Sequence, residues 1–308
     1  MIGTGQNPAN AEIMTRAVQG RSLWMDARRR LLRNRAAMAG LVILAIITLL
    51  ALLAPLLSTY SYDGIDYNAI SCAPDWWPAQ AACNAGGTHW FGTDAEGRDL
   101  FVRVLYGARV SLAVGLVATL VSLLIGVFYG ATAGYLGGRV DGVMMRIVDV
   151  LYSLPFIFFV IILMILFNRN FILLFVAIGA VEWLTMARIV RGQTLSIKQK
   201  EFVEAARASG VSSFGIIRHH VVPNVMGPVI VYITLTVPSV ILTESFLSFL
   251  GLGIHEPLTS WGVLISDGAG QESAPWLLLF PALLMAVTLF CFNFIGDGLR
   301  DALDPKDR

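Results

Sequence analysis

The chain has 308 residues, of which 56% are hydrophobic and only 14% are charged. Because about a quarter of the residues in a soluble domain are charged, this composition excludes an ordinary soluble domain. The formal net charge of +1 also gives no reason to expect a general attraction to nucleic acids.

The first predicted element is an amphipathic helix over residues 22–38, which begins within a basic segment formed by residues 1–35. Its leucines and Trp24 can face lipid while its arginines meet anionic headgroups. A basic segment that only sets the orientation of the chain in the membrane explains the same residues equally well. In both interpretations residues 1–35 are expected to lie in the cytoplasm.

Six apolar runs are long enough to cross the hydrocarbon core of a membrane, which takes about 20 residues. The fourth run is the weakest because it contains Glu182 and Arg188. The sequence therefore predicts an all-α membrane protein with six transmembrane helices, at about residues 36–57, 110–135, 144–167, 171–190, 221–250 and 276–295.

Lysines and arginines indicate the cytoplasmic side, where they are enriched in membrane proteins. They are concentrated in the N-terminal segment, in the loops after the second and fourth helices, and in the tail at residues 300–308. The opposite side holds only Arg98, Arg103, Arg109 and Arg169. Both termini are thus predicted to be cytoplasmic, and residues 58–103 are predicted to form an external, periplasmic loop between the first two helices.

Two of the three cysteines, Cys72 and Cys83, lie in this external loop. The periplasm would permit a disulfide between them, and closing a loop of that size would contribute roughly 3 kcal/mol. The third cysteine, Cys291, lies in the sixth predicted helix and is expected to be a packing residue.

Small residues recur every four positions along the second predicted helix, so another helix can approach that face closely. They are Ala118, Ser122, Gly126, Gly130 and Gly134. In the fifth helix, Pro238 removes a backbone hydrogen bond and is expected to bend the helix. Such a bend either reflects packing or lines a pathway.

Charged side chains inside predicted membrane helices are candidates for function. Glu244 lies well inside the fifth helix, where it either lines a conduit and meets a cationic group of a substrate, or holds a neighbouring helix by hydrogen bonding. We favour the second interpretation. Asp149 and Glu182 are expected to be polar contacts at helix ends or between helices.

The sequence carries no recognisable catalytic signature. It contains no Gly-Lys dipeptide, and therefore no phosphate-binding loop of the Walker A type. Its four histidines lack the spacing of metal ligands, and no arrangement of Ser, His and Asp typical of a hydrolase is present. We therefore expect no catalytic residue, no metal site and no bound cofactor in this chain.

A polar loop at about residues 192–222 separates the fourth and fifth predicted helices. A short helix is predicted from Lys200 to Ser209, after which Gly210 can adopt the left-handed conformation that ends a helix and Ser212 or Ser213 can cap the next turn. Its alanines keep it slim enough to enter a groove on a partner protein, where two phenylalanines would be buried. The residues predicted to form this contact are Glu204, Ala205, Ala206, Gly210, Phe202 and Phe214. A solvated connector without a partner is the alternative.

The order Glu204–Ala206, three further residues, Gly210 and then Pro223 resembles the EAA loop of bacterial ATP-binding cassette (ABC) importer permeases. The family pattern ends in Ile-x-Leu-Pro, whereas residues 220–223 of this chain read His-Val-Val-Pro. The proline matches, and the isoleucine and leucine do not.

Further segments resemble the dipeptide/oligopeptide permease group of this family. They are Phe91–Asp94, Gly97–Asp99, Gly137–Asp141, Glu244–Gly253, Ser260–Gly262, Asp267–Gly268 and Gly298–Lys306. On these segments the chain is most similar to the C-type subunit of the oligopeptide importer.

The resemblance implies a type I ABC importer transmembrane domain at residues 104–299, with helices two to six and an ATPase-coupling loop at 192–222. It also implies a bacterial inner-membrane location, a second permease subunit, two ATPase subunits that use ATP and Mg, and a periplasmic peptide-binding protein. Dipeptide, glutathione and nickel permeases share much of the pattern, so these substrates stay open as alternatives. A secondary carrier is the alternative of another class, and it would need its own ion-coupling residues.

Overall fold

The computed structural model describes residues 23–77, 87–166, 171–254 and 256–303. These residues form helices joined by turns, with no strand among them apart from an isolated bridge between Thr93 and Asp99. In chain order the helices are α2 (Leu23–Arg33), α3 (Arg35–Leu57), α4 (Leu100–Leu136), α5 (Gly138–Ser153), α6 (Phe156–Leu166), α7 (Phe171–Ile197), α8 (Glu201–Ala208), α9 (Ser213–Ile216), the π-helical turn η1 (Ile217–Val221), α10 (Val222–Phe249), α11 (Trp261–Ala269) and α12 (Trp276–Leu303).

Four helical stretches of the described chain are long and apolar enough to cross a membrane: α3, α4, the continuous stretch Ser213–Phe249, and α12. They correspond to the first, second, fifth and sixth predicted transmembrane helices. The third and fourth predictions fall on α5 with α6 and on α7, which are not among the four. α5 and α6 are separated at Pro155, because proline lacks a backbone donor and disfavours the helical conformation of the residue before it.

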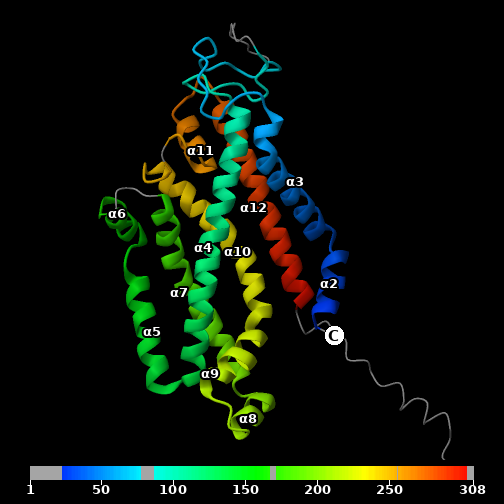
Figure 1. The fold of residues 1–308 in the computed structure, drawn as a ribbon, viewed down its shortest axis with the longest axis vertical. Coiled ribbons are helices and arrows are strands. Elements are labelled where there is room, and N and C mark those ends of the chain that lie inside the picture. The colour runs from blue at the N-terminus through cyan, green and yellow to red at the C-terminus, as the bar shows by residue number, and fades with distance from the viewer. Residues whose placement is uncertain (1–22, 78–86, 167–170, 255, 304–308) are drawn as a thin grey trace, which may run out of the picture.

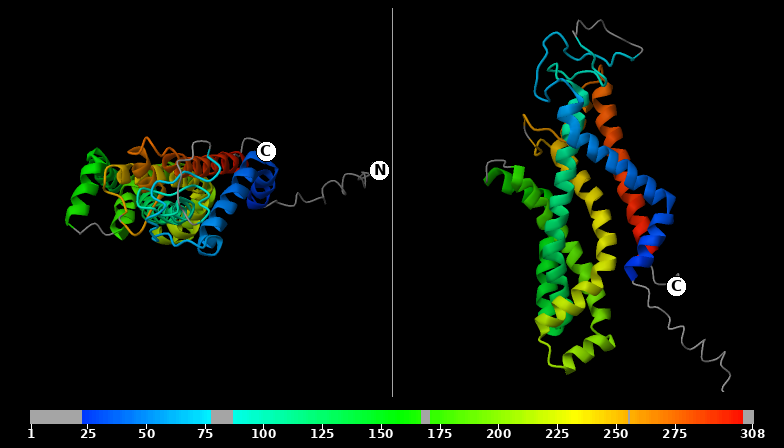
Figure 2. Two further views of the ribbon diagram at one scale, coloured as in Figure 1. Left: turned by 90° about the horizontal axis from the view of Figure 1, so that it is seen from above. Right: turned by 45° about the vertical axis from the view of Figure 1, so that its right-hand side comes forward.

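The molecule is elongated, and its two ends carry different elements (Figure 1). The loop segments 58–77 and 87–99, with α11 nearby, lie toward one end, whereas α2, the end of α12, α8 and α9 lie toward the other. α3 and α12 pack together on one side of α4, and α5, α6 and α7 lie on the other side, as the turned view also shows (Figure 2). The predicted external loop and the polar loop at 192–222 are therefore at opposite ends.

The predicted amphipathic helix at 22–38 is divided at Asn34, which corrects the sequence prediction. The side-chain oxygen of Asn34 accepts hydrogen bonds from the N–H groups of Ala36 and Ala37, both at 3.1 Å. Asparagine is among the most favourable N-cap residues because it satisfies donors that lack a helical partner. α2 therefore ends at Arg33 and α3 starts as a separate helix.

Three further boundaries differ from the sequence prediction. Asp99 caps α4 by accepting from the N–H of Val102, so α4 begins at Leu100, before the end of the predicted external loop at residue 103. α7 continues to Ile197, into the predicted polar loop, and α12 continues to Leu303, into the predicted tail. Charged residues follow the apolar runs without a helix breaker, so hydropathy alone set these ends too early.

The small-residue face of α4 packs against α7, as predicted. All five of its small residues are buried. A Cβ atom added to Gly126 would lie 2.6 Å from the Met186 side chain, and one added to Gly134 would lie 2.8 Å from Thr194. Larger residues would push the two helices apart, so the close approach depends on glycine at these positions.

Pro55 interrupts the backbone hydrogen bonding of α3, and an arginine of α4 donates hydrogen bonds in place of the missing N–H. Proline has no N–H, so the carbonyl of Ala51 loses its helical partner. Arg109 donates from Nε to the Ala51 carbonyl and from Nη2 to the Leu52 carbonyl, the second at 2.8 Å. Its guanidinium also lies 4.5 Å from the ring centroid of Tyr106. This arginine therefore joins α3 to α4 through the Ala51 carbonyl that the proline freed and through the neighbouring Leu52 carbonyl.

Candidate functional site

α8 is the short helix predicted within the polar loop. It spans Glu201–Ala208, one residue inside the predicted bounds at each end. Glu201 and Glu204 lie in its first turn and Arg207 in its last, which is the favourable arrangement of charge with respect to the helix dipole. The predicted helix is thus confirmed, and its local sequence accounts for its formation.

Gly210 ends α8 in the manner predicted. Its φ angle is +81°, in the left-handed region that favours glycine. The N–H of Gly210 donates to the Arg207 carbonyl at 3.0 Å, and the N–H of Val211 donates to the Ala206 carbonyl at 3.1 Å. These two bonds form a Schellman motif, which satisfies carbonyls that the end of the helix leaves free.

The chain then turns directly into the next helix. Ser212, rather than Ser213, is the cap of α9, because its side-chain oxygen accepts from the N–H of Gly215 at 3.2 Å. α9 continues through η1 into α10 without a break. π-helical turns often occur at functional sites, and this one joins the α8–α9 region to a long apolar helix.

The two faces of α8 differ in exposure. Val203 and Ala206 are buried in a cluster with side chains of α4, α7, η1 and α10. Glu204 and Ala205 are exposed. The buried face packs against the bundle, so the opposite face points outward.

The two predicted phenylalanine contacts are exposed in the single chain, at 43% for Phe202 and 66% for Phe214. They are therefore not core residues: Phe202 lies in α8 and Phe214 in α9. Glu204 and Arg207 do not form an ion pair within the described chain, although their spacing permits one. The guanidinium of Arg207 lies instead 5.6 Å from the ring centroid of Tyr135 in α4.

Two polar contacts join the same end of α7 to α4 and α5. Lys198 Nζ donates to the Gly134 carbonyl at 3.0 Å. Arg191 donates to both carboxylate oxygens of Asp141, at 2.5 and 2.6 Å. This hydrogen bonding holds the pKa of Asp141 below its ordinary value. The end of the bundle to which α8 is attached is therefore itself held together by hydrogen bonds from Lys198 and Arg191.

The structure places Glu244 inside the bundle. Its side chain is 0% exposed, and Oε1 accepts hydrogen bonds from Ser248 at 2.8 Å and from Ser260 at 2.7 Å. Ser260 in turn caps α11. These contacts favour the interpretation that Glu244 holds a neighbouring element. Pro238 is also buried, within a continuous α10, and a pathway role for either residue stays a prediction.

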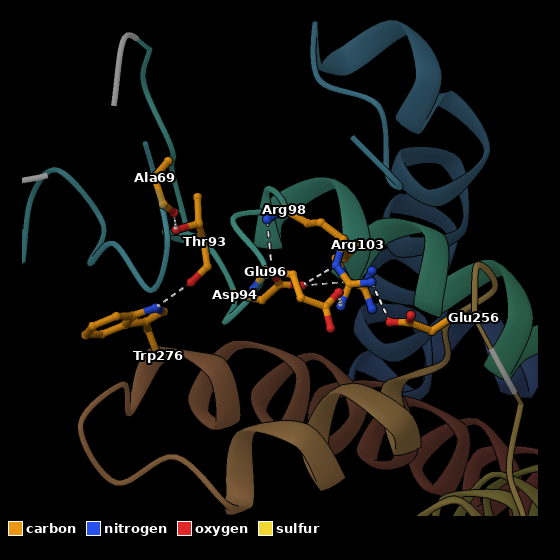
Figure 3. A network of polar contacts seen from close by, with 8 residues as sticks. All are labelled: Ala69, Thr93, Asp94, Glu96, Arg98, Arg103, Glu256 and Trp276. Carbon is orange, nitrogen blue, oxygen red and sulfur yellow. Dashed lines mark hydrogen bonds and ion pairs between the residues drawn. The ribbon is translucent and has the colours of Figure 1, made fainter. Parts of the chain in front are cut away.

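A polar network at the loop end of the molecule is the feature that the sequence reasoning did not find (Figure 3). Arg98 forms ion pairs with Asp94 at 2.7 Å, with Glu96 at 2.6 Å, and with Glu256 in the segment between α10 and α11. Burial alone would lower the pKa of Arg98, but its hydrogen bonds to Glu256 and Asp94 raise it overall. The segment that precedes α4 is thus joined to one that follows α10.

Arg103 lies beneath this network. It is only 1% exposed, and its Nε is 3.4 Å from the Asp94 carboxylate. The network borders a cavity of about 260 Å³, which Asp267 also lines. Burial raises the pKa of Asp267, although Arg103 and Arg98 oppose this shift. Within the described ranges, no group of three or more His, Cys, Asp or Glu side chains is placed to hold a metal ion.

The loop is also joined to α12. Trp276 Nε1 donates to the Thr93 carbonyl at 3.3 Å, and the hydroxyl of Thr93 donates to the Ala69 carbonyl (Figure 3). The N–H of Cys72 donates to the Thr93 hydroxyl at 2.9 Å. Cys83 lies outside the described residues, so the predicted Cys72–Cys83 disulfide stays a prediction.

Comparison with known families is consistent with these features. Residues 122–308 match the family model described as "Binding-protein-dependent transport system inner membrane component". Residues 22–74 match a second model, the "N-terminal TM domain of oligopeptide transport permease C". The chain therefore belongs to the family of binding-protein-dependent transport system inner membrane components, and it is a multi-pass membrane protein.

Individual relatives are similar over nearly the whole chain. The chain is 62% identical over 292 residues to the oligopeptide transport system permease protein OppC of Escherichia coli strain K12, covering 94% of both proteins. It is 60% identical to OppC of Salmonella typhimurium, again over 94% of both. It is 48% identical to the dipeptide transport system permease protein DppC of Bacillus subtilis, over 93% of this chain and 87% of that protein.

Proposed function

We propose that this chain is the permease subunit of an ATP-driven ABC importer that carries oligopeptides across the bacterial inner membrane. Support comes from relatives named as oligopeptide permeases, which reach 62% identity over 94% of the chain. The oligopeptide permeases of Escherichia coli and Salmonella typhimurium exceed the 48% identity of the Bacillus subtilis dipeptide permease, whereas OppC of Bacillus subtilis is less similar, at 44%. Oligopeptides are the substrate class we propose, with dipeptides, glutathione and nickel as the alternatives.

In this proposal the chain crosses the membrane six times. The part of α5 from about residue 144, together with α6, forms the third crossing, and α7 up to about residue 190 forms the fourth. Both termini and α8 are cytoplasmic, and the loop at 58–99 is periplasmic. Two observations support this topology: the basic residues gather on the proposed cytoplasmic segments, and α2, the end of α12 and α8 lie toward the same end of the molecule (Figure 1).

The observation that carries the proposal is the presentation of α8. A helix whose buried face packs into the bundle through Val203 and Ala206 displays Glu204 and Ala205 outward. A groove on an ATPase subunit would receive that exposed face, with Phe202 and Phe214 as its apolar contacts. Movement of the ATPase would then be transmitted to α4, α7 and α10, because the buried face of α8 belongs to an apolar cluster that includes side chains of all three.

The chain itself supplies no hydrolytic site in this account. Two partner ATPase subunits bind ATP and Mg, a second permease subunit completes the pathway, and a periplasmic binding protein delivers the peptide. The loop at 58–99 is the surface offered to that binding protein. The Arg98 network would keep the loop in a fixed position relative to α10 and α11. Binding of the partner to the loop can therefore shift the conformational equilibrium of the helices.

The test uses the complete transporter reconstituted in proteoliposomes. Glu204→Lys reverses a charge on the exposed face of α8, and like charges brought together at an interface cost several kcal/mol. We therefore expect stimulation of the ATPase by peptide-loaded binding protein to fall about tenfold or more. Glu272→Lys makes the same change on an exposed residue before α12 and serves as the control.

Insertion of the variant chain and its assembly with the second permease should be unchanged. Gly210→Pro, which removes the N–H that bonds Arg207, is expected to uncouple transport in the same way. Normal ATPase stimulation in both variants would show that α8 does not receive the ATPase.

A further inference from the structure

A cavity of about 320 Å³ opens between α5, α6, α7 and α10. Its volume lies at the lower end of the range of about 300–1,000 Å³ that is usual for small-molecule sites. It is mainly apolar, with four polar side chains. These are Tyr152 on α5, Glu182 and Thr185 on α7, and Thr243 on α10.

Glu182 is the one charged residue in this lining. Within the part of the chain that the structure describes, its carboxylate has no hydrogen bond and no ion pair. Glu244, by contrast, is fully buried and accepts from two serines. An acidic side chain in a membrane helix usually faces a water-filled space or another charge, so the unpartnered carboxylate of Glu182 indicates that something polar enters this cavity.

The face around the cavity is not suited to lipid. Arg188 donates to Asp149 at 2.8 Å, and this ion pair is largely exposed, at 41% for the arginine side chain and 55% for the aspartate. The guanidinium of Arg188 also lies 4.4 Å from the ring centroid of Tyr152, which lines the cavity. Because exposed charges in hydrocarbon are costly, this face meets water or protein in the assembled transporter.

The charges on this face select the kind of group that the cavity can bind. Asp149 and Arg188 neutralise one another, so Glu182 gives the cavity a net negative charge. The hydroxyls of Tyr152, Thr185 and Thr243 can accept further hydrogen bonds. A primary ammonium group has three donors and a positive charge, and it therefore fits one carboxylate surrounded by hydroxyl acceptors.

We propose that this cavity is a subsite of the translocation pathway, in which Glu182 receives the amino-terminal ammonium group of a peptide. The inference rests on the proposed function and adds a recognition residue to it. It also changes the sequence-based interpretation, in which Glu182 was a polar contact at a helix end or between helices and the pathway candidates were Glu244 and Pro238.

The first test measures peptide uptake and ATP hydrolysis together in proteoliposomes that contain the complete transporter. An ion-paired hydrogen bond is worth enough that Glu182→Gln should lower the amount of peptide moved per ATP about tenfold. Stimulation of the ATPase by loaded binding protein should persist, because α8 is untouched. Glu182→Asp should restore uptake, and Glu272→Gln, an exposed carboxylate elsewhere, should leave it unchanged.

The second test does not depend on transport. Thr243→Cys places a thiol in the lining of the cavity, and its reaction rates with cationic and anionic methanethiosulfonate reagents are compared in the complete transporter. Labelling of the chain without Thr243→Cys is subtracted. A cavity lined by one sign of charge concentrates counter-ions by about tenfold or more, so the cationic reagent should react faster. Adding Glu182→Gln should abolish that preference.

The outcomes separate the subsite from the function on which it rests. Equal labelling by both reagents, or uptake unaffected by Glu182→Gln, would overturn the inference even if ATP-driven peptide uptake is normal. Protection of Thr243→Cys in the complete transporter, with labelling in the isolated chain, would also overturn it, because a partner subunit would then fill the cavity. Cation preference without any ATP-driven peptide uptake would refute the peptide ligand together with the proposed function.

Discussion

Replacing Gly210 by alanine mainly changes how easily residue 210 adopts a positive φ angle. The residue has a φ of +81°, and a Cβ atom added there would meet nothing within 4 Å. The cost of Gly210→Ala is therefore conformational rather than steric. Holding an L-residue in the left-handed region costs about 1–2 kcal/mol, and this cost falls on the end of α8.

The two hydrogen bonds of the Schellman motif should report that cost. They join Gly210 N–H to the Arg207 carbonyl and Val211 N–H to the Ala206 carbonyl. If local opening becomes easier by 1–2 kcal/mol, these amides exchange with solvent about 5–30 times faster. Hydrogen exchange of the purified chain, followed by mass spectrometry, measures this directly. The rest of the bundle should exchange at its original rate.

Gly192 provides a matched control. It lies inside α7, also has open space around its Cα, and has no positive φ. Gly192→Ala should therefore stabilise its helix by about 0.5–1 kcal/mol and leave exchange at residues 205–211 unchanged. Unaltered exchange in Gly210→Ala, or an equal increase in both variants, would refute the reasoning about the helix end.

Three further changes test other parts of the structure. Ser260→Ala removes the cap of α11 and a hydrogen bond to Glu244, so the free energy of unfolding in detergent should fall by about 2–4 kcal/mol; an unchanged denaturation midpoint would contradict this. Gly130→Ala places a methyl group against the backbone of α7 and should cost about 1–3 kcal/mol, visible as a lower melting temperature; an equal or higher one would disagree. The hydrogen bond from Arg191 lowers the pKa of Asp141 in the folded chain. The ionised carboxylate therefore adds stability that is complete above its unfolded pKa, near the ordinary value of 3.8. That stability is lost as the pH falls through the lower folded pKa. Wild type should melt above Asp141→Asn at pH 7 and approach it below pH 3.8, and a constant difference at all pH values would be inconsistent with this pairing.

Local features of the fold were predictable because short-range chemistry determines them. A serine cap at position 212 or 213 and the left-handed glycine at 210 follow from the conformational preferences of single residues. The small-residue face of α4 follows from the helical repeat. Each needs information from only a few neighbouring positions, and the structure confirms all three.

The features that the sequence did not reveal depend on contacts between distant segments. Arg98 meets Glu256 across 158 positions, and no local pattern shows which acid an arginine will meet. The distinction between Glu182 and Glu244 has the same origin. Both are acids in predicted membrane helices, and only the packed structure shows that one is buried and accepts from two serines through Oε1 while the other lines a cavity.

The central claim is that an ATPase subunit contacts the exposed face of α8. Site-specific cross-linking from Ala205→Cys in the complete transporter tests this most directly, with Glu272→Cys as an exposed control elsewhere on the chain. We expect a covalent product between this chain and the ATPase from position 205 and none from position 272. Normal ATP-driven uptake without a cross-link from position 205, or an equal cross-link from both positions, would contradict the account.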